Sequence, residues 1–187
     1  GKFDRAIEDF DQAISLKPEY DRPWSCRGMA YFDKGEFDKA IEDYDMAISL
    51  DPKDAIFRFF RGAAYASKGN FEEAIENYDV AIDLDPEYTI AWYYRGLSYA
   101  EKGELHKAIE NYDQAITLDP EDAYFWNSRG RIYADSGEFD KAMEDYGRSI
   151  SLKPEYDMAW FYRGRACFDK GEYDRAIEDF DEAINLD

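Results

Sequence analysis

Residues 89–122 read TIAWYYRGLSYAEKGELHKAIENYDQAITLDPED, and close copies of this stretch return along the whole chain of 187 residues. A glycine recurs every 34 residues from Gly1 to Gly171, and a proline recurs at the same step from Pro18 to Pro154. A strict period of this length is typical of a repeat architecture, in which each unit buries its apolar face against its neighbours.

Each copy predicts two helices. Apolar residues recur at helical spacing over residues 89–102 and again over about residues 104–118. Gly103 lies between the two segments, where glycine readily adopts the left-handed conformation that ends a helix. Pro120 follows the second segment, and proline stops a helix because it lacks the amide donor. The small residues Gly96 and Ala108 predict a close crossing of the paired helices.

The repeated residues resemble the tetratricopeptide repeat (TPR), whose motif is Trp-x2-Leu-Gly-x2-Tyr, then Ala-x3-Phe, then Pro. The residues that carry the resemblance are Trp92, Gly96, Tyr99, Ala108, Tyr112 and Pro120. The resemblance implies an all-α fold, a right-handed superhelical solenoid of antiparallel helix pairs with about 11 helices. It predicts one TPR array over residues 1–187. Its parts are a second helix of a partial repeat (1–20), four full repeats (21–54, 55–88, 89–122 and 123–156) and a nearly full last repeat (157–187).

One departure from the motif recurs in every copy, because arginine replaces the leucine of the family. The five residues are Arg27, Arg61, Arg95, Arg129 and Arg163. A partly buried arginine needs an acidic partner. Aspartates that could supply it stand on the second helices at Asp45, Asp79, Asp113 and Asp181, while Gly147 interrupts that series. We expect each arginine to pair with acids of its own or an adjoining repeat.

The resemblance also implies a binding surface, because first helices line the concave face of TPR arrays and their variable residues face inward. We expect this surface to be an aromatic groove that binds a peptide or an amphipathic helix, since aromatic and arginine side chains dominate interface hot spots. The predicted groove residues are Ile56, Phe59, Phe60, Ile90, Tyr93, Tyr94, Leu97, Tyr124, Asn127, Arg131, Met158, Phe161, Tyr162 and Arg165. A second interpretation is that one aromatic of each consecutive pair only packs between repeats.

Composition narrows the classes of partner. The formal net charge of −20 disfavours nucleic acid and anionic membranes, so we expect protein or peptide partners. The chain's one histidine, His106, stands at a charged surface position, and no metal-ligand spacing or phosphate-binding glycine loop occurs. We therefore expect no enzyme activity, no cofactor and no metal. Cys26 and Cys167 are expected to be free thiols, which favours a cytoplasmic location.

Two other functions stay open. The chain begins inside a repeat, which suggests a regulatory or targeting arm of a larger enzyme. The regular second helices suggest instead a structural self-assembling module or an engineered array. Self-association through open solenoid ends is also predicted, because uncovered apolar helix faces favour it.

Overall fold

The computed structural model describes residues 1–186, and within them eleven α-helices and no strands are present. The helices are α1 (Lys2–Leu16), α2 (Asp21–Asp33), α3 (Phe37–Leu50), α4 (Ala55–Ser67), α5 (Phe71–Leu84), α6 (Thr89–Glu101), α7 (Leu105–Leu118), α8 (Ala123–Asp135), α9 (Phe139–Leu152), α10 (Asp157–Lys170) and α11 (Tyr173–Leu186).

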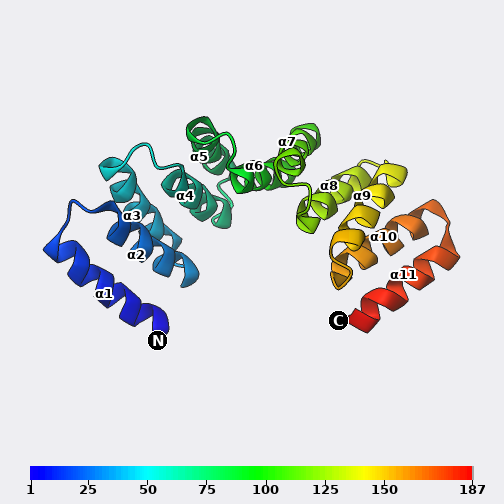
Figure 1. The fold of residues 1–187 in the computed structure, drawn as a ribbon, viewed down its shortest axis with the longest axis horizontal. Helices are drawn as coiled ribbons and strands as arrows, with labels where there is room; N and C mark the ends of the chain where they lie inside the picture. Colours follow the sequence, from blue (N-terminus) through cyan, green and yellow to red (C-terminus); the bar gives the residue numbers. More distant parts are fainter. Residues whose placement is uncertain (187) are drawn as a thin grey trace. The chain divides into compact units, whose positions relative to one another are not determined.

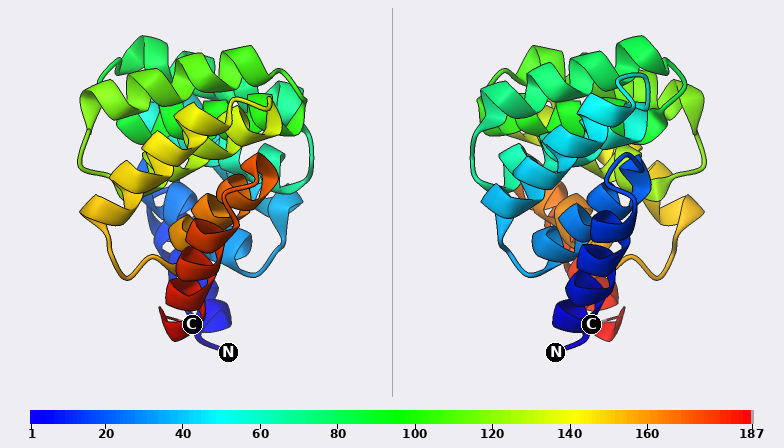
Figure 2. Two further views of the ribbon diagram at one scale, coloured as in Figure 1. Left: turned by 90° about the vertical axis from the view of Figure 1, so that its right-hand side faces the viewer. Right: turned by 90° about the vertical axis from the view of Figure 1, so that its left-hand side faces the viewer.

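The chain divides into two compact units, Gly1–Lys102 and Gly103–Asp187. The first unit holds α1 to α6 and the second holds α7 to α11. Within each unit consecutive helices pack as antiparallel hairpins, which Figure 1 shows for α2–α3 and α8–α9 and Figure 2 shows for α10–α11. The division falls inside the third repeat, between α6 and α7. The repeat boundaries and the single continuous array stay predictions.

Glycine closes the turn inside every helix pair, as the period predicted. Gly35 and Gly69 have φ angles of 77° and 81°, and the equivalent glycines have similarly positive values. This left-handed region is accessible to glycine at little steric cost, whereas a Cβ atom is disfavoured there. These glycines therefore set where each first helix ends.

A second glycine series allows the two helices of a pair to approach closely, which confirms the predicted crossing in the repeats of Gly28, Gly62, Gly130 and Gly164. A Cβ atom built on Gly28 would lie 2.9 Å from the Tyr44 ring, and one on Gly62 would lie 2.7 Å from the Tyr78 ring. Both tyrosines are completely buried. The ring of the second helix thus packs directly on the glycine backbone of the first.

The tryptophans of the motif hold the first helix to the preceding loop. The indole N–H of Trp24 donates to the carbonyl of Pro18 at 3.0 Å, and Trp92 makes the same bond to Pro86 at 2.9 Å. Arg58 stands at this position in the second repeat, and its buried Nε has no hydrogen-bond partner among the described residues. The second repeat therefore lacks one anchor that the others have.

Candidate functional site

A cavity of about 500 Å³ opens in the first unit on the face that its first helices form. Helices α2, α4 and α6 lie next to one another there and contribute most of the wall, and α3 and α5 each add one aromatic ring. The lining side chains are Met29, Phe32, Asp33, Tyr44, Phe59, Phe60, Ala63, Ala66, Ser67, Phe71, Tyr94, Leu97, Ser98 and Glu101. Most of this wall is apolar, so the cavity is suited to an apolar side chain.

Four of the predicted groove residues of the first unit line this cavity: Phe59, Phe60, Tyr94 and Leu97. Phe59 packs edge-on against Phe60 and against Tyr94, with ring centroids 5.3 Å apart in both pairs. Only 7% of Phe59 is exposed, so it supports the wall more than it offers contact area. Three further predicted groove residues do not line the cavity: Ile56, Ile90 and Tyr93.

In the second unit, arginine side chains line the corresponding cavity, which is smaller. Arg131, Tyr162 and Arg165 line a smaller cavity of about 130 Å³, and the Arg131 guanidinium lies 5.2 Å from the centre of the Tyr162 ring. Asn127 is only 3% exposed, and its side-chain amide donates to the Tyr156 hydroxyl at 3.3 Å. The other predicted groove residues of this unit are exposed outside that cavity: Tyr124, Met158 and Phe161. Met158 and Phe161 line another cavity of about 500 Å³, which is mostly apolar and is completed by Phe180, Ala183 and Ile184 of α11.

Sequence analysis missed several residues of the larger cavity. They are Met29, Phe32, Asp33, Tyr44, Ala63, Ala66, Ser67, Phe71, Ser98 and Glu101. One signal was present, because Met29 stands 68 residues, or two repeats, before the predicted Leu97. Nothing in the sequence indicated Tyr44, since its position in the motif belongs to the core.

The recurring arginines are paired, as predicted. Arg27 on α2 donates two bonds to Asp43, at 2.8 and 2.6 Å, and one to Asp11 at 2.5 Å. Asp43 follows the arginine by 16 residues on its own second helix, and Asp11 precedes it by 16 on the helix before. The second unit repeats this with Arg129, which bonds Asp145 and Asp113. The prediction allowed an acid of either repeat, but it named only the series of Asp45, Asp79, Asp113 and Asp181 and not the buried aspartates Asp43 and Asp145.

Burial and pairing oppose each other at these carboxylates. Burial is the larger effect at Asp145 and raises its pKa above the usual range, although the Arg129 guanidinium acts in the other direction. A permanently charged guanidinium at bidentate distance keeps such a carboxylate ionised at neutral pH. These arginines are therefore already occupied by structural partners, so we take the cavity of the first unit, which four of the predicted groove residues line, as the candidate binding site.

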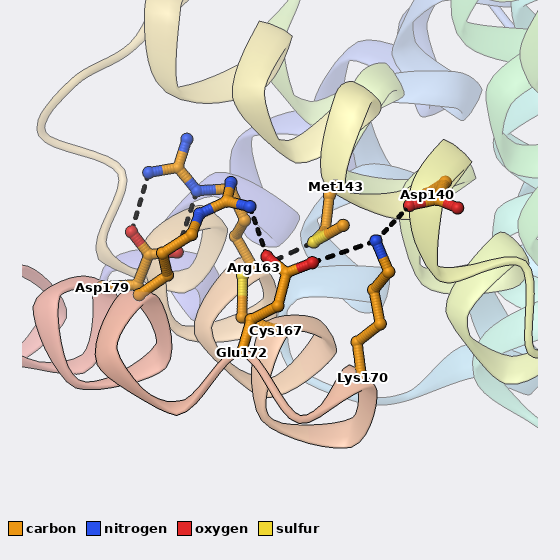
Figure 3. Close-up of polar contacts among 8 residues, drawn as sticks. Asp140, Met143, Arg163, Cys167, Lys170, Glu172 and Asp179 are labelled. Atoms are coloured by element: carbon orange, nitrogen blue, oxygen red, sulfur yellow. Dashed lines mark hydrogen bonds and ion pairs between the residues drawn. The ribbon is translucent and has the colours of Figure 1, made fainter.

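The last arginine differs from the others. Arg163 donates to Asp179 on α11, at 2.9 Å from Nε and 2.7 Å from the Nη2 atom, as Figure 3 shows. Gly147 stands where the preceding repeats carry an aspartate, so within residues 1–186 the Nη1 atom of Arg163 has no acidic partner. Asp181, the fourth aspartate of the predicted series, is exposed and does not bond this arginine.

Residues 1–186 contain no group of three or more His, Cys, Asp and Glu side chains arranged to hold a metal ion. Over the same residues, no helix has both the length and the apolar character that crossing a membrane requires.

Comparison with known families identifies the class of protein. A family model described as tetratricopeptide repeat matches residues 1–55, 27–89 and 129–187, and a TPR repeat model matches residues 96–135. The chain therefore belongs to the tetratricopeptide repeat family. Its all-α fold of antiparallel helix pairs is the fold class that the sequence predicted. Members of this family typically act as scaffolds for protein–protein interaction, and they are generally not enzymes.

Several solved structures resemble this chain. The crystal structure of MamA is 31% identical over 85% of this chain and 93% of its own, with a TM-score of 0.79. A MamA segment from Desulfovibrio magneticus RS-1 is 19% identical over 89% and 94%, with a TM-score of 0.81. YrrB, described as a TPR protein with an unusual peptide-binding site, is 23% identical over 96% and 93%, with a TM-score of 0.75. A search of curated protein sequences finds no match.

Proposed function

We propose that this protein is an interaction scaffold that binds a peptide or an amphipathic helix in the cavity of its first unit. The observation that carries the proposal is the cavity of about 500 Å³ between α2, α4 and α6, with a mostly apolar wall. An apolar pocket of this size is large enough to bury a side chain of a partner. The wall is preformed by packed rings, which lowers the entropic cost of binding.

Partial exposure of the side chains in the cavity wall supports the proposal that the cavity binds a partner. Met29 is 41% exposed and Tyr94 is 37% exposed, although both lie beside buried core residues. Large apolar side chains left open in a concave surface are typical of interaction sites. Tyr94 also carries a hydroxyl, which can bond a partner while its ring supplies apolar contact.

Two variants test the proposal with little change to the core. Leu97→Ser removes an anchor, and Ala63→Gln places a polar chain across the cavity, because both positions are only half-buried. Peptides selected from a random 12-residue display library on the wild-type protein would be measured by fluorescence anisotropy. We expect both variants to weaken binding about tenfold or more, as the loss of a hot-spot contact does.

The control is Met46→Ser, since Met46 is 41% exposed on α3 and is not part of this cavity. Circular dichroism checks that each variant stays folded. If the selected peptides bind the cavity variants and the wild type equally well, the proposal is wrong.

Self-association is a second candidate, which rests on α11. Tyr173, Ile177 and Ile184 are 59%, 58% and 74% exposed there, whereas Ile41 and Ile48, at the positions of Ile177 and Ile184 on α3, are buried against α4. An uncovered face of this kind favours association with another helix. Sedimentation velocity tests it, and a chain that stays monomeric up to millimolar concentration would contradict it.

A further inference from the structure

The rim of the large cavity is acidic. Asp33 is the last residue of α2 and Glu101 is the last residue of α6, and both line the cavity and are exposed. Neither carboxylate has a hydrogen bond or an ion pair within residues 1–186. Of the residues described as lining the cavity, none is cationic.

Helix dipoles add to this negative potential. The ends of α2, α4 and α6 all contribute a terminal residue to the cavity, at Asp33, Ser67 and Glu101. The C-terminal end of a helix carries a partial negative charge, which favours a cation. None of the three helices has a basic residue in its last turn.

The lysines that follow these helices are bound elsewhere. The Nζ atom of Lys34 lies 2.8 Å from a carboxylate oxygen of Asp4, on α1, and 2.9 Å from one of Glu36, in the turn before α3. The equivalent lysines pair with acids of second helices in the same way: Lys68 with Asp38, and Lys102 with Glu72. They therefore do not neutralise the rim, and a cation has to come from the partner.

A buried hydroxyl in the wall also lacks a partner. Tyr44 is 0% exposed and lines the cavity, yet its hydroxyl makes no hydrogen bond within the described part of the chain. Burial raises the pKa of this phenol, so it stays protonated and can both donate and accept. The hydroxyl of Tyr78, at the same position of the next repeat, also lacks a partner among residues 1–186 although Tyr78 does not line the cavity, so the missing bond recurs with the repeat.

Resting on the proposed function, we infer that the cavity selects a basic segment, in which an apolar side chain is flanked by lysine or arginine. The apolar side chain packs against Phe60 and Leu97, and the flanking cations meet the carboxylate of Asp33 or of Glu101 at the rim. The small cavity of the second unit differs, because Arg131 and Arg165 line it together with Asp135 and Asp169, so its own cations already balance its acids.

Three fluorescein-labelled 14-residue peptides test the inference at 0.15 M salt. The first peptide forms an amphipathic helix with leucines on one face and lysines on the other. The second has glutamate in place of each lysine, and the third has glutamine in place of each leucine. We expect the leucine–lysine peptide to bind at least about tenfold more tightly than either of the others, because it alone supplies both the apolar and the cationic contact.

The protein variants separate a local contact from the effect of net charge. Asp33→Asn with Glu101→Gln should weaken binding of the leucine–lysine peptide about tenfold. Glu76→Gln with Asp83→Asn removes the same two charges from exposed positions on α5 and should change binding by less than about twofold, because exposed charges further away are screened.

The outcomes distinguish this inference from the proposed function. If both double variants weaken binding equally, or if the glutamate peptide binds as well as the lysine peptide, the inference of a basic partner is wrong. The proposal that the cavity binds peptides is not affected by that result. If Ala63→Gln leaves the binding of every peptide unchanged, or no peptide binds, the cavity is not a binding site and both proposals fail.

Discussion

Gly147→Asp should stabilise the second unit by completing the arginine pairing that the other repeats have. A Cβ atom built on Gly147 would lie 3.8 Å from the Nη1 atom of Arg163 and would meet no other atom within 4 Å. The aspartates at this position in the preceding repeats bond their arginines directly, as Asp113 does with Arg129 at 2.5 Å. An aspartate at position 147 can therefore reach the unpaired nitrogen without moving the backbone.

The expected gain has two parts. Glycine is less favourable than aspartate inside a helix by about 0.3 kcal/mol, so the substitution gains that amount from α9 alone. The equivalent aspartates are about half exposed, for example 47% for Asp113, which makes the new ion pair worth about 0.5–1 kcal/mol. The sum is about 1 kcal/mol, or about 2–4 °C in Tm for a chain of this size.

Urea unfolding followed by circular dichroism measures the change, and amide hydrogen exchange in α9 and α10 locates it. Gly147→Asn is the matched control, since asparagine has nearly the same shape and helix propensity without the charge. The excess of the aspartate variant over the asparagine variant should shrink at 1 M salt and vanish in an Arg163→Gln background. Equal stability of the two variants, or an excess that survives Arg163→Gln, would refute the reasoning.

Three further predictions follow from the contacts described above. Gly62→Ala should lower the free energy of unfolding by about 1–3 kcal/mol, because its Cβ would lie 2.7 Å from the ring of Tyr78; a urea titration that shows no loss would contradict it. Buried Cys167, whose thiol pKa is raised by burial, should be alkylated by iodoacetamide more slowly than half-buried Cys26; mass spectrometry showing the reverse order would contradict it. Hydrogen bonding from a lysine lowers the pKa of Glu172 below its ordinary value of 4.5, so this carboxylate stabilises the fold above that pH and its contribution is lost as pH falls through the lowered pKa. Glu172→Gln should therefore reduce the loss of stability below about pH 4.5, and an unchanged acid profile would contradict it.

The ion pairs behind the last prediction join α10 to α9 and to the turn that follows α10. Lys170 lies 2.5 Å from Asp140 on α9 and 3.0 Å from Glu172 at the start of the next turn, and Figure 3 shows it between them. Beside them the thiol of Cys167 contacts the sulfur of Met143 at 3.4 Å. Exposed pairs of this kind add modest stability individually, so the packing of α10 on α9 contributes more.

The amino-acid sequence by itself determined the helix pairs, the turns and the crossings of this protein. Each depends on residues close together in the chain: Gly69 ends one helix, Gly62 permits the approach of the next, and Pro86 stops it. A period of 34 residues repeats these local signals, so the predicted ends of the helices differ from the observed ends by about one residue, as in α6 and α7. The pairing of the arginines was predictable for a related reason, because a buried charge needs a partner at a fixed step.

Only the tertiary structure decided which side chains meet in the cavity. Tyr44 and Glu101 come from different repeats, and their approach depends on how α2, α4 and α6 pack rather than on any local pattern. The predicted groove residues Phe59 and Asn127 are buried. They stand at the same position of the first helix in their repeats, and there the side chain packs between neighbouring repeats. Periodicity gives the face of a helix, but burial depends on the size of the neighbouring side chains, which differ from repeat to repeat.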